Sequence, residues 1–119
     1  MKYLFLLLLL CSFTISGEPK HVGLKGVKVI SASTQQVFGL NTVYYVKFKN
    51  NSTRSVDGLK WKATFTDNFG EVKGVREGKW ESGNLITPIE PGEEAEDLEN
   101  IYIKRATKVK IVITTVHFN

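Results

Sequence analysis

Few side chains in this 119-residue sequence could support catalysis. Only His21 and His117 could act as imidazole bases, and both lie near the ends of the chain. Ser82, in Glu81-Ser82-Gly83, comes nearest to a nucleophile elbow, but the first glycine of that pattern is missing. A hydrolase needs a nucleophile, a base and a group that orients the base. The sequence therefore predicts no catalytic residue and favours a protein that is not an enzyme.

Metal binding has little more support. The single cysteine, Cys11, lies in an apolar N-terminal run, and two remote histidines match no common zinc pattern. The segment 90–99 is acidic and contains no basic residue, and several carboxylates could hold a calcium ion. The spacing of these acids matches no calcium loop. We interpret them as a solvated strand edge that discourages association, and we expect no metal and no cofactor.

Lysines at alternate positions could bind a polyanion. The four candidates, on two neighbouring segments, are Lys47, Lys49, Lys60 and Lys62. The net charge is +4, and residues 20–62 contain one acid, Asp57. These lysines could contact anionic envelope polymers. Equally, they could be solubilising residues on the wet faces of strands. We expect no nucleic-acid partner, because an exported protein seldom meets one.

A protein contact is the other candidate function. Trp80 lies in a polar segment between glycines, without clear apolar neighbours. Interface hot spots are rich in tryptophan, so Trp80 is a candidate contact residue, with partial burial under a loop as the alternative. Glu93, Glu94 and Glu96 could contribute to the same surface or enter the cleft of a basic enzyme.

The N-terminus has the layout of a secretory signal peptide. A positive start is followed by an apolar run at residues 3–10 and by small residues, so cleavage after Ser16 or Gly17 fits. The run is too short to span a bilayer as a helix. Cys11 could instead carry a lipid, which is the one way in which we expect membrane contact, but Leu10 fits that signal poorly. We expect residues 1–17 to be the signal peptide and the protein to be periplasmic or extracellular.

The rest of the chain, residues 18–119, reads as one all-β domain. Residue patterns predict strands or short extended pieces at 22–32, 42–49, 59–66, 71–76, 79–81, 85–89, 93–99, 100–103 and 107–118. A break is expected at Glu77-Gly78, a polar connection at residues 31–41, and a helix is the alternative for residues 93–99. Asn50 and Asn51 both begin glycosylation sequons.

The two central strands predict the architecture. Residues 42–49 and 59–66 each alternate an apolar with a lysine-bearing face. Direct pairing would set Lys47 near Lys60, which is unfavourable. If the strands lie in different sheets, the lysines point outwards on opposite sides and the apolar faces meet around Trp61. We therefore predict an immunoglobulin-like antiparallel β-sandwich of six to seven strands.

Residues 46–72 resemble the immunoglobulin-like modules of exported bacterial proteins, including the FxLYD group. The shared features are an asparagine-serine connection, an alternating strand, Asp67 and Gly70, and the later Pro91-Gly92-Glu93 is also similar. Thr66 replaces the second aromatic residue of the motif. The resemblance implies a fold and an accessory role, and no functional residue carries over. We expect an exported binding module that acts on an unknown protein partner.

Overall fold

All elements of secondary structure in the computed structural model, which describes residues 20–37 and 41–119, are strands. They are β1 (Val27–Val37), β2 (Asn41–Asn50), β3 (Val56–Thr66), β4 (Val72–Glu81), β5 (Glu94–Ile101) and β6 (Lys108–Phe118). In these described ranges, no helix has the length and apolar character needed to cross a membrane. The predicted all-β fold is confirmed, whereas Cys11, Ser16 and Gly17 lie outside the described residues.

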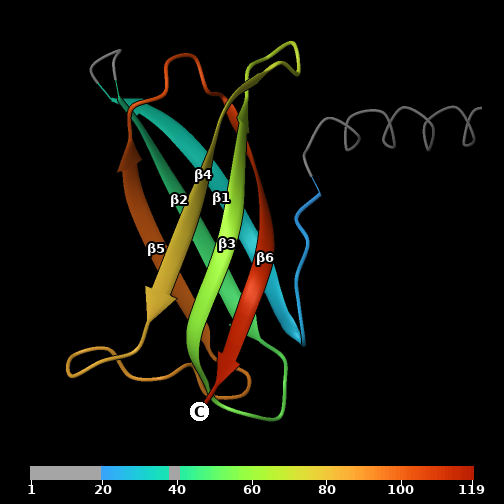
Figure 1. The fold of residues 1–119 in the computed structure, drawn as a ribbon, viewed down its shortest axis with the longest axis vertical. Helices are drawn as coiled ribbons and strands as arrows, with labels where there is room; N and C mark the ends of the chain where they lie inside the picture. Colours follow the sequence, from blue (N-terminus) through green and yellow to red (C-terminus); the bar gives the residue numbers. More distant parts are fainter. Residues whose placement is uncertain (1–19, 38–40) are drawn as a thin grey trace, which may run out of the picture.

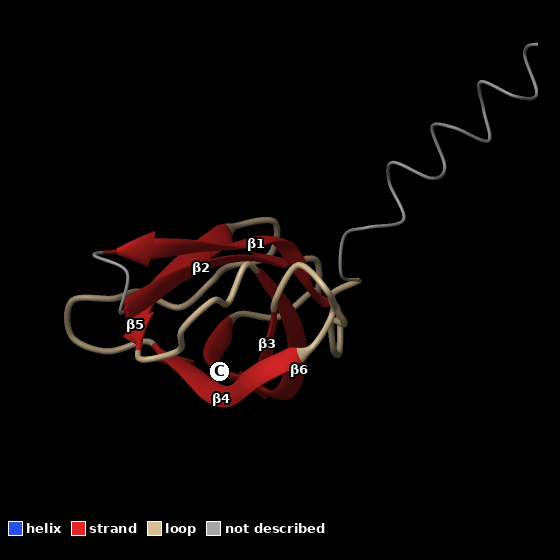
Figure 2. Cartoon of the chain, turned by 90° about the horizontal axis from the view of Figure 1, so that it is seen from above, coloured by secondary structure: helices blue, strands red, loops and turns tan. Residues whose placement is uncertain are grey.

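The strands form two sheets, with the orders β1-β2-β5 and β4-β3-β6, and every pairing is antiparallel. The sheets pack face to face as two layers (Figures 1 and 2). β2 and β3 follow one another in the sequence but belong to different sheets. The alternation of apolar residues and lysines in these strands correctly predicted the β-sandwich.

Trp61 occupies the centre of the core and is 1% exposed. Its ring lies 4.9 Å from that of Phe48, and its Nε1 donates a hydrogen bond to the Tyr44 hydroxyl over 3.2 Å. A Cβ atom at Gly78 would lie 2.0 Å from the Trp61 ring, so only glycine fits there. Consequently the predicted break at Glu77-Gly78 is wrong. β4 runs through it, and the glycine makes room for the indole.

The N-terminal part differs from the predicted strand at residues 22–32. Val22 instead forms a parallel bridge to Val112, with hydrogen bonds of 2.9 Å to the backbone of Ile111 and Ile113. This segment covers the outer edge of β6. A register shift between Lys60 and Trp61 places Val116 on the buried face of β6 together with Val109, Ile111 and Ile113.

β1 starts only after a turn at Lys25-Gly26, where both residues have positive φ angles (51° and 86°). It then continues through the polar residues 31–37, which the sequence suggested were a connection. These residues pair with β2 up to Val37 and Asn41. Backbone pairing with an established neighbour therefore outweighs the weak strand preference of Ser, Thr and Gln.

On the opposite side of the sandwich, β4 and β5 are the last strands of their sheets. We name the two ends of the molecule by their loops. The acidic end contains the connection 82–93, and the basic end contains the turn 67–71 and the connection 102–107 (Figure 1).

Candidate functional site

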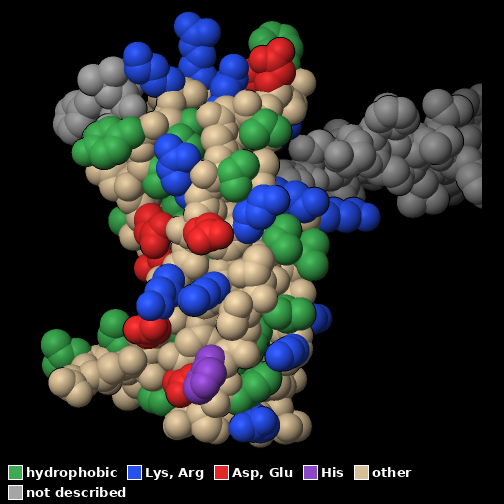
Figure 3. Space-filling view, in the orientation of Figure 1, with side chains coloured by type: hydrophobic (Ala, Val, Ile, Leu, Met, Phe, Trp, Pro, Cys, Tyr) green, Lys and Arg blue, Asp and Glu red, His purple; other side chains and the backbone are tan. Residues whose placement is uncertain are grey.

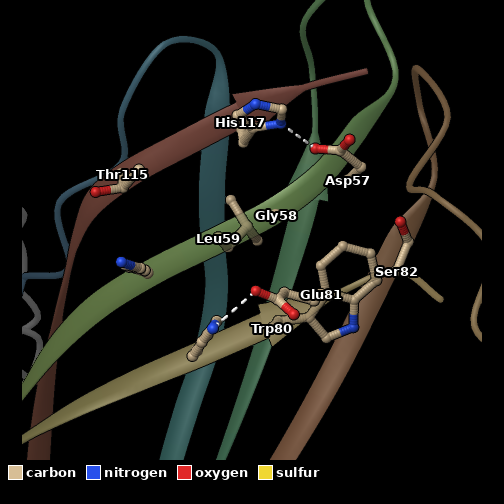
Figure 4. A pocket seen from close by; sticks show the side chains of 10 residues that line it. Asp57, Gly58, Leu59, Trp80, Glu81, Ser82, Thr115 and His117 are labelled. Carbon is tan, nitrogen blue, oxygen red and sulfur yellow. Dashed lines mark hydrogen bonds and ion pairs between the residues drawn. The ribbon is translucent and has the colours of Figure 1, made fainter.

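A shallow groove on the outer face of the β4-β3-β6 sheet contains a His–Asp pair, His117 and Asp57. His117 Nδ1 lies 2.5 Å from Asp57 Oδ1, and Gly58 leaves the space between them and β4 open (Figure 4). Ser82 lies away from His117, and its backbone N–H donates to the Asp57 carbonyl over 2.9 Å. His21 is remote from this groove and accepts a hydrogen bond from the Ile111 N–H over 3.0 Å. Ser82 and His117 therefore do not form a nucleophile–base pair.

The acidic residues do not assemble into a metal centre. Across residues 20–37 and 41–119, no three His, Cys, Asp or Glu side chains are placed to hold a metal ion. β5 confirms the predicted strand at 93–99 and excludes the helical alternative.

The four candidate polyanion-binding lysines lie on two opposite faces. Lys47 and Lys49 belong to β2, whereas Lys60 and Lys62 belong to β3 in the other sheet. Their division follows from the sandwich itself. A single bound polymer segment could therefore contact one pair only.

Lys47 of β2 is paired with two acids of β5, Glu94 and Glu96. Lys47 Nζ lies 3.3 Å from Glu96 Oε1 and 3.6 Å from Glu94 Oε1. Tyr45 also donates a hydrogen bond to Glu96. The hydrogen bonds from Tyr45 and Lys47 lower the pKa of Glu96, and the bond to Glu96 raises the pKa of Lys47. Lys47 was predicted to belong to a polyanion site and Glu96 to a protein contact, but their charges partly neutralise each other.

Trp80 is 9% exposed and belongs to the core. The face of the Trp80 ring therefore cannot contact a partner, and the alternative prediction, burial under a loop, fits the structure better. The reason lies in the pairing of β3 and β4: Trp80 is opposite Leu59, so both side chains point inwards.

The predicted contact residues nevertheless come together. Trp80 lies at the bottom of a groove, the Trp80 groove, bounded by the connection 82–93 and the start of β5. Its lining includes all four predicted contact residues and the apolar residues of the connection, namely Trp80, Leu85, Ile86, Pro88, Ile89, Glu93, Glu94, Ala95 and Glu96.

Leu85 and Ile86 were missed as contact candidates. Leu85 is 98% exposed and Ile86 is 51% exposed, and hydrophobic side chains stand out at this end in Figure 3. The sequence suggested an extended piece at residues 85–89, of which only Ile89 pairs, with Val56. The signal was available: Gly83-Asn84 and Pro88 enclose too few residues for a packed strand.

Buried Asn50 holds the acidic end together. Its Nδ2 donates to the carbonyl oxygens of Arg54 and Ile89, both over 2.8 Å, and its Oδ1 accepts from Ser52. The side chain is 0% exposed, whereas Asn51 is exposed. Of the two sequons, only the one at Asn51 could therefore be modified in the folded protein.

Two carboxylates of β5 face inwards at the open side of the sandwich. Glu99 Oε2 accepts a hydrogen bond from the Tyr44 hydroxyl over 2.7 Å. Asp97 Oδ2 is buried and has no hydrogen-bond partner within the part of the chain that the structure describes. Burial, followed by the neighbouring charge of Glu99, raises the pKa of Asp97 to about 6. Burial likewise raises the pKa of Tyr44.

Comparisons with known proteins give information on the fold only. No family model matches the chain, and no curated protein matches it. A crystal structure of a DUF1425 family member from Shewanella sp. pv-4 is similar over 87% of this chain and 94% of its own, with a TM-score of 0.51 and 17% identity. A β-glucuronidase of glycoside hydrolase family 2 gives a TM-score of 0.38 at 14% identity, over 79% of this chain and 12% of its own. The DUF1425 structure, at 17% identity, indicates a shared β-sandwich fold and nothing further, and the second similarity carries no argument.

Proposed function

We propose that this chain is a non-enzymatic binding module whose Trp80 groove takes an extended segment of another protein. The supporting observation is the exposure of Leu85 and Ile86 beside that groove. Apolar side chains that gather in water at a groove are typical of interaction sites. Burying each of them in a contact would contribute about 1.5–3 kcal/mol.

The charges around the groove define the partner. Glu93 and Glu94 lie on its rim, and Lys47 is the cation paired with this group. β5 borders the groove and has no strand on its outer side in the described sheet. A segment that runs along β5 could form main-chain hydrogen bonds with it while its basic side chains meet the glutamates. The expected ligand is therefore an extended segment with alternating apolar and basic residues.

Photo-crosslinking tests the site directly. A photoreactive phenylalanine analogue replaces Leu85 in one preparation and Phe69 in a matched control, since Phe69 is 91% exposed at the other end. Illumination of intact cells should give a discrete crosslinked protein from position 85 and not from position 69. Its crosslinked peptide, read by mass spectrometry, should be basic and apolar.

A charge and apolar variant completes the test. In the chain that carries the photoreactive residue at position 85, Ile86→Ser with Glu93→Lys should abolish the crosslink and lower the affinity of the identified segment, while Phe69→Ser should leave both unchanged. The same crosslinks from both positions, or an acidic segment at position 85, would show that the Trp80 groove is not the binding site. An inhibitor of a basic enzyme is a variant of this proposal, in which the bound segment lies in the enzyme's cleft and binding abolishes its activity.

A second candidate is the binding of anionic envelope polymers to the outer face of the β4-β3-β6 sheet. Lys60 lies directly opposite Lys79, whose Nζ is 2.8 Å from Glu81 Oε1, and Lys62 lies opposite Glu77. Adjacent like charges are unfavourable, so a bound polyanion would stabilise the Lys60–Lys79 pair beyond what Glu81 contributes. Retention on a sulfated glycan column should fall for Lys60→Glu with Lys62→Glu and stay unchanged for Lys47→Glu with Lys49→Glu. Equal retention of both variants contradicts it.

Export is part of the same proposal. It is supported by the layout of residues 1–17 and by the turns shared with immunoglobulin-like modules of the FxLYD type, at Asp67-Gly70 and Pro91-Gly92. The intact mass of the protein purified from the cell envelope should correspond to cleavage after Ser16 or Gly17. A lipid-sized addition on Cys11 would point to a membrane anchor instead.

A further inference from the structure

At the basic end, two aromatic side chains stand in water. Phe69, on the turn between β3 and β4, is 91% exposed, and Tyr102, at the start of the β5–β6 connection, is 79% exposed. The two loops belong to one end because the Thr107 N–H donates to the Thr66 carbonyl over 2.9 Å (Figure 1). Neither ring contributes to the core, so their exposure calls for a role outside the molecule.

The turn that bears Phe69 is rigid. Asp67 Oδ1 accepts hydrogen bonds from the backbone N–H groups of Phe69, over 2.9 Å, and Glu71, over 3.0 Å. Gly70 has a φ angle of 82°, which suits glycine. The turn therefore holds the phenylalanine outwards without any packing of its ring.

The connection that bears Tyr102 is equally anchored. Ile103 and Ala106 are buried, and Thr42 Oγ1 donates to the Ile103 carbonyl over 2.5 Å. Arg105 adopts a φ angle of 61°, a conformation that an arginine rarely takes unless its surroundings impose it. Since Ile103 and Ala106 point inwards, the residues between and before them point outwards. They are Tyr102, Lys104 and Arg105, all exposed.

The charge of this end is positive. Asp67 and Glu71 are both paired with Lys73, at 3.3 and 3.5 Å. Lys104 and Arg105 have no carboxylate partner among the residues that the structure describes. Lys and Arg side chains accordingly gather at this end in Figure 3. Two exposed rings thus stand beside uncompensated cations.

We infer that the basic end docks on the surface of an anionic lipid bilayer. Aromatic rings are enriched at the level of the lipid headgroups, and each cation close to anionic lipids adds to the attraction. Phe69 and Tyr102 would enter that layer, and Lys104 and Arg105 would meet the lipid phosphates. A bilayer fits better than a soluble polymer, because exposed rings and unpaired cations occur together at one end of the molecule. This contact requires no lipid on Cys11 and does not depend on the Trp80 groove.

Vesicle sedimentation tests the inference. The wild type and every variant are expressed from the full sequence and purified in the same way, so that any processing of the N-terminus is the same in all of them. It should bind vesicles that contain phosphatidylglycerol more tightly than pure phosphatidylcholine vesicles, and 0.5 M salt, on the order of a 4 Å Debye length, should release it. Lys104→Glu with Arg105→Glu should lower the partition coefficient at least roughly 30-fold. Phe69→Ser with Tyr102→Ser should also lower it, whereas Leu85→Ser with Ile86→Ser should not.

A second readout locates the docking surface. In Phe69→Trp, brominated phosphatidylglycerol should quench the added tryptophan, while buried Trp61 and Trp80 give an unquenched background. Lack of binding by the wild type, or equal losses in the Leu85→Ser, Ile86→Ser control, would overturn the inference. A combination of two results would also overturn it: no quenching in Phe69→Trp, and binding to dextran sulfate that the Lys104→Glu, Arg105→Glu variant loses. That combination would indicate a binding site for a soluble polymer.

Discussion

The two ends of this sandwich are built alike and charged oppositely. The acidic end presents the aliphatic Leu85 and Ile86 beside glutamates, and the basic end presents Phe69 and Tyr102 beside cations. At both ends, exposed apolar residues lie on connections that a few buried residues anchor, namely Ile89 at the acidic end and Ile103 and Ala106 at the basic end. Loops can therefore be anchored in a similar way and still differ in chemistry, since one core supports two surfaces of opposite charge.

The anchors differ in burial. Asn50 organises the acidic end from within the protein and is 0% exposed, whereas Asp67 organises the turn of the basic end at the surface. A buried polar group that loses its partners cannot turn to water, but a surface group can. The acidic end should therefore depend on its organiser more strongly.

The largest expected effect removes the core that both ends share. Trp61→Ala should lower the free energy of unfolding by about 3–5 kcal/mol, because it deletes a fully buried ring and leaves a cavity. Urea denaturation followed by circular dichroism measures this change. Gly83→Ala is the control, since nothing lies within 4 Å of its added Cβ atom. A small effect of Trp61→Ala would mean that the ends fold independently of the sandwich core.

The next effect compares the two organisers. Asn50→Ala should cost about 2–4 kcal/mol, because this buried side chain loses its hydrogen bonds to Ile89, Arg54 and Ser52 together, although the Ile89 carbonyl keeps the bond from the Val56 N–H. Asp67→Ala should cost clearly less, because water can replace the carboxylate at that turn. Thermal melts of both variants, with exposed Asn51→Ala as the control, decide the order. The reverse order would refute the distinction between a buried and a surface organiser.

A third prediction concerns pH and belongs to neither end. The pKa of Asp97 is raised to about 6 in the folded protein from 3.8. Between these values the folded protein binds more protons than the unfolded chain at this residue, so this contribution to stability falls as the pH rises from about 4 to about 6. With allowance for solvent screening, the loss is on the order of 1 kcal/mol.

Asp97→Asn should remove that pH dependence. The variant should be more stable than the wild type at pH 7 and differ little at pH 4, as chemical denaturation at the two pH values would show. Binding at either end should not change. A larger stabilisation at pH 4 than at pH 7 would have the wrong sign and would contradict the raised pKa.

The variant with the smallest expected effect makes the acidic end more negative and so increases the charge difference between the two ends. Lys47→Gln removes the cation paired with Glu94 and Glu96. The melting temperature should stay within the error of the measurement, because exposed ion pairs contribute little. Affinity for a basic segment at the Trp80 groove should increase, and vesicle binding at the basic end should not change. Calorimetric titration of the segment identified by crosslinking measures the first of these, and a weaker affinity would exclude Glu94 and Glu96 from that contact.

Much of the fold could be predicted because its signal is local. Alternation in residues 42–49 and 59–66 placed β2 and β3 in different sheets, and Trp61 was correctly placed in the core. The errors arose where a distant contact decides the structure. The sequence predicts a break at Gly78, because the contact of Trp61 with this glycine cannot be seen in it. It predicts a connection at residues 31–37, because the pairing of these residues with β2 cannot be seen either.

The candidate site was predicted in part. Trp80 and the glutamates 93, 94 and 96 do share one groove, although they are separated by a connection of irregular structure. Partial burial of Trp80 was expected from the sequence, whereas the exposure of Leu85 was not, because the course of the loop decides it. Nor could composition reveal that Lys47 meets Glu96, which requires knowing that β5 pairs with β2.

The segment that covers β6 limits how copies of this protein can assemble. Backbone groups of Ile111 and Ile113 are already bonded to Val22, so the β4-β3-β6 sheet can gain a new strand on its β4 side only. Association through that sheet would stop at a symmetric pair, since a filament needs a free edge on both sides. A short stretch of chain thus blocks strand addition at the middle of β6, whereas β1 and β5 remain the outer strands of the other described sheet.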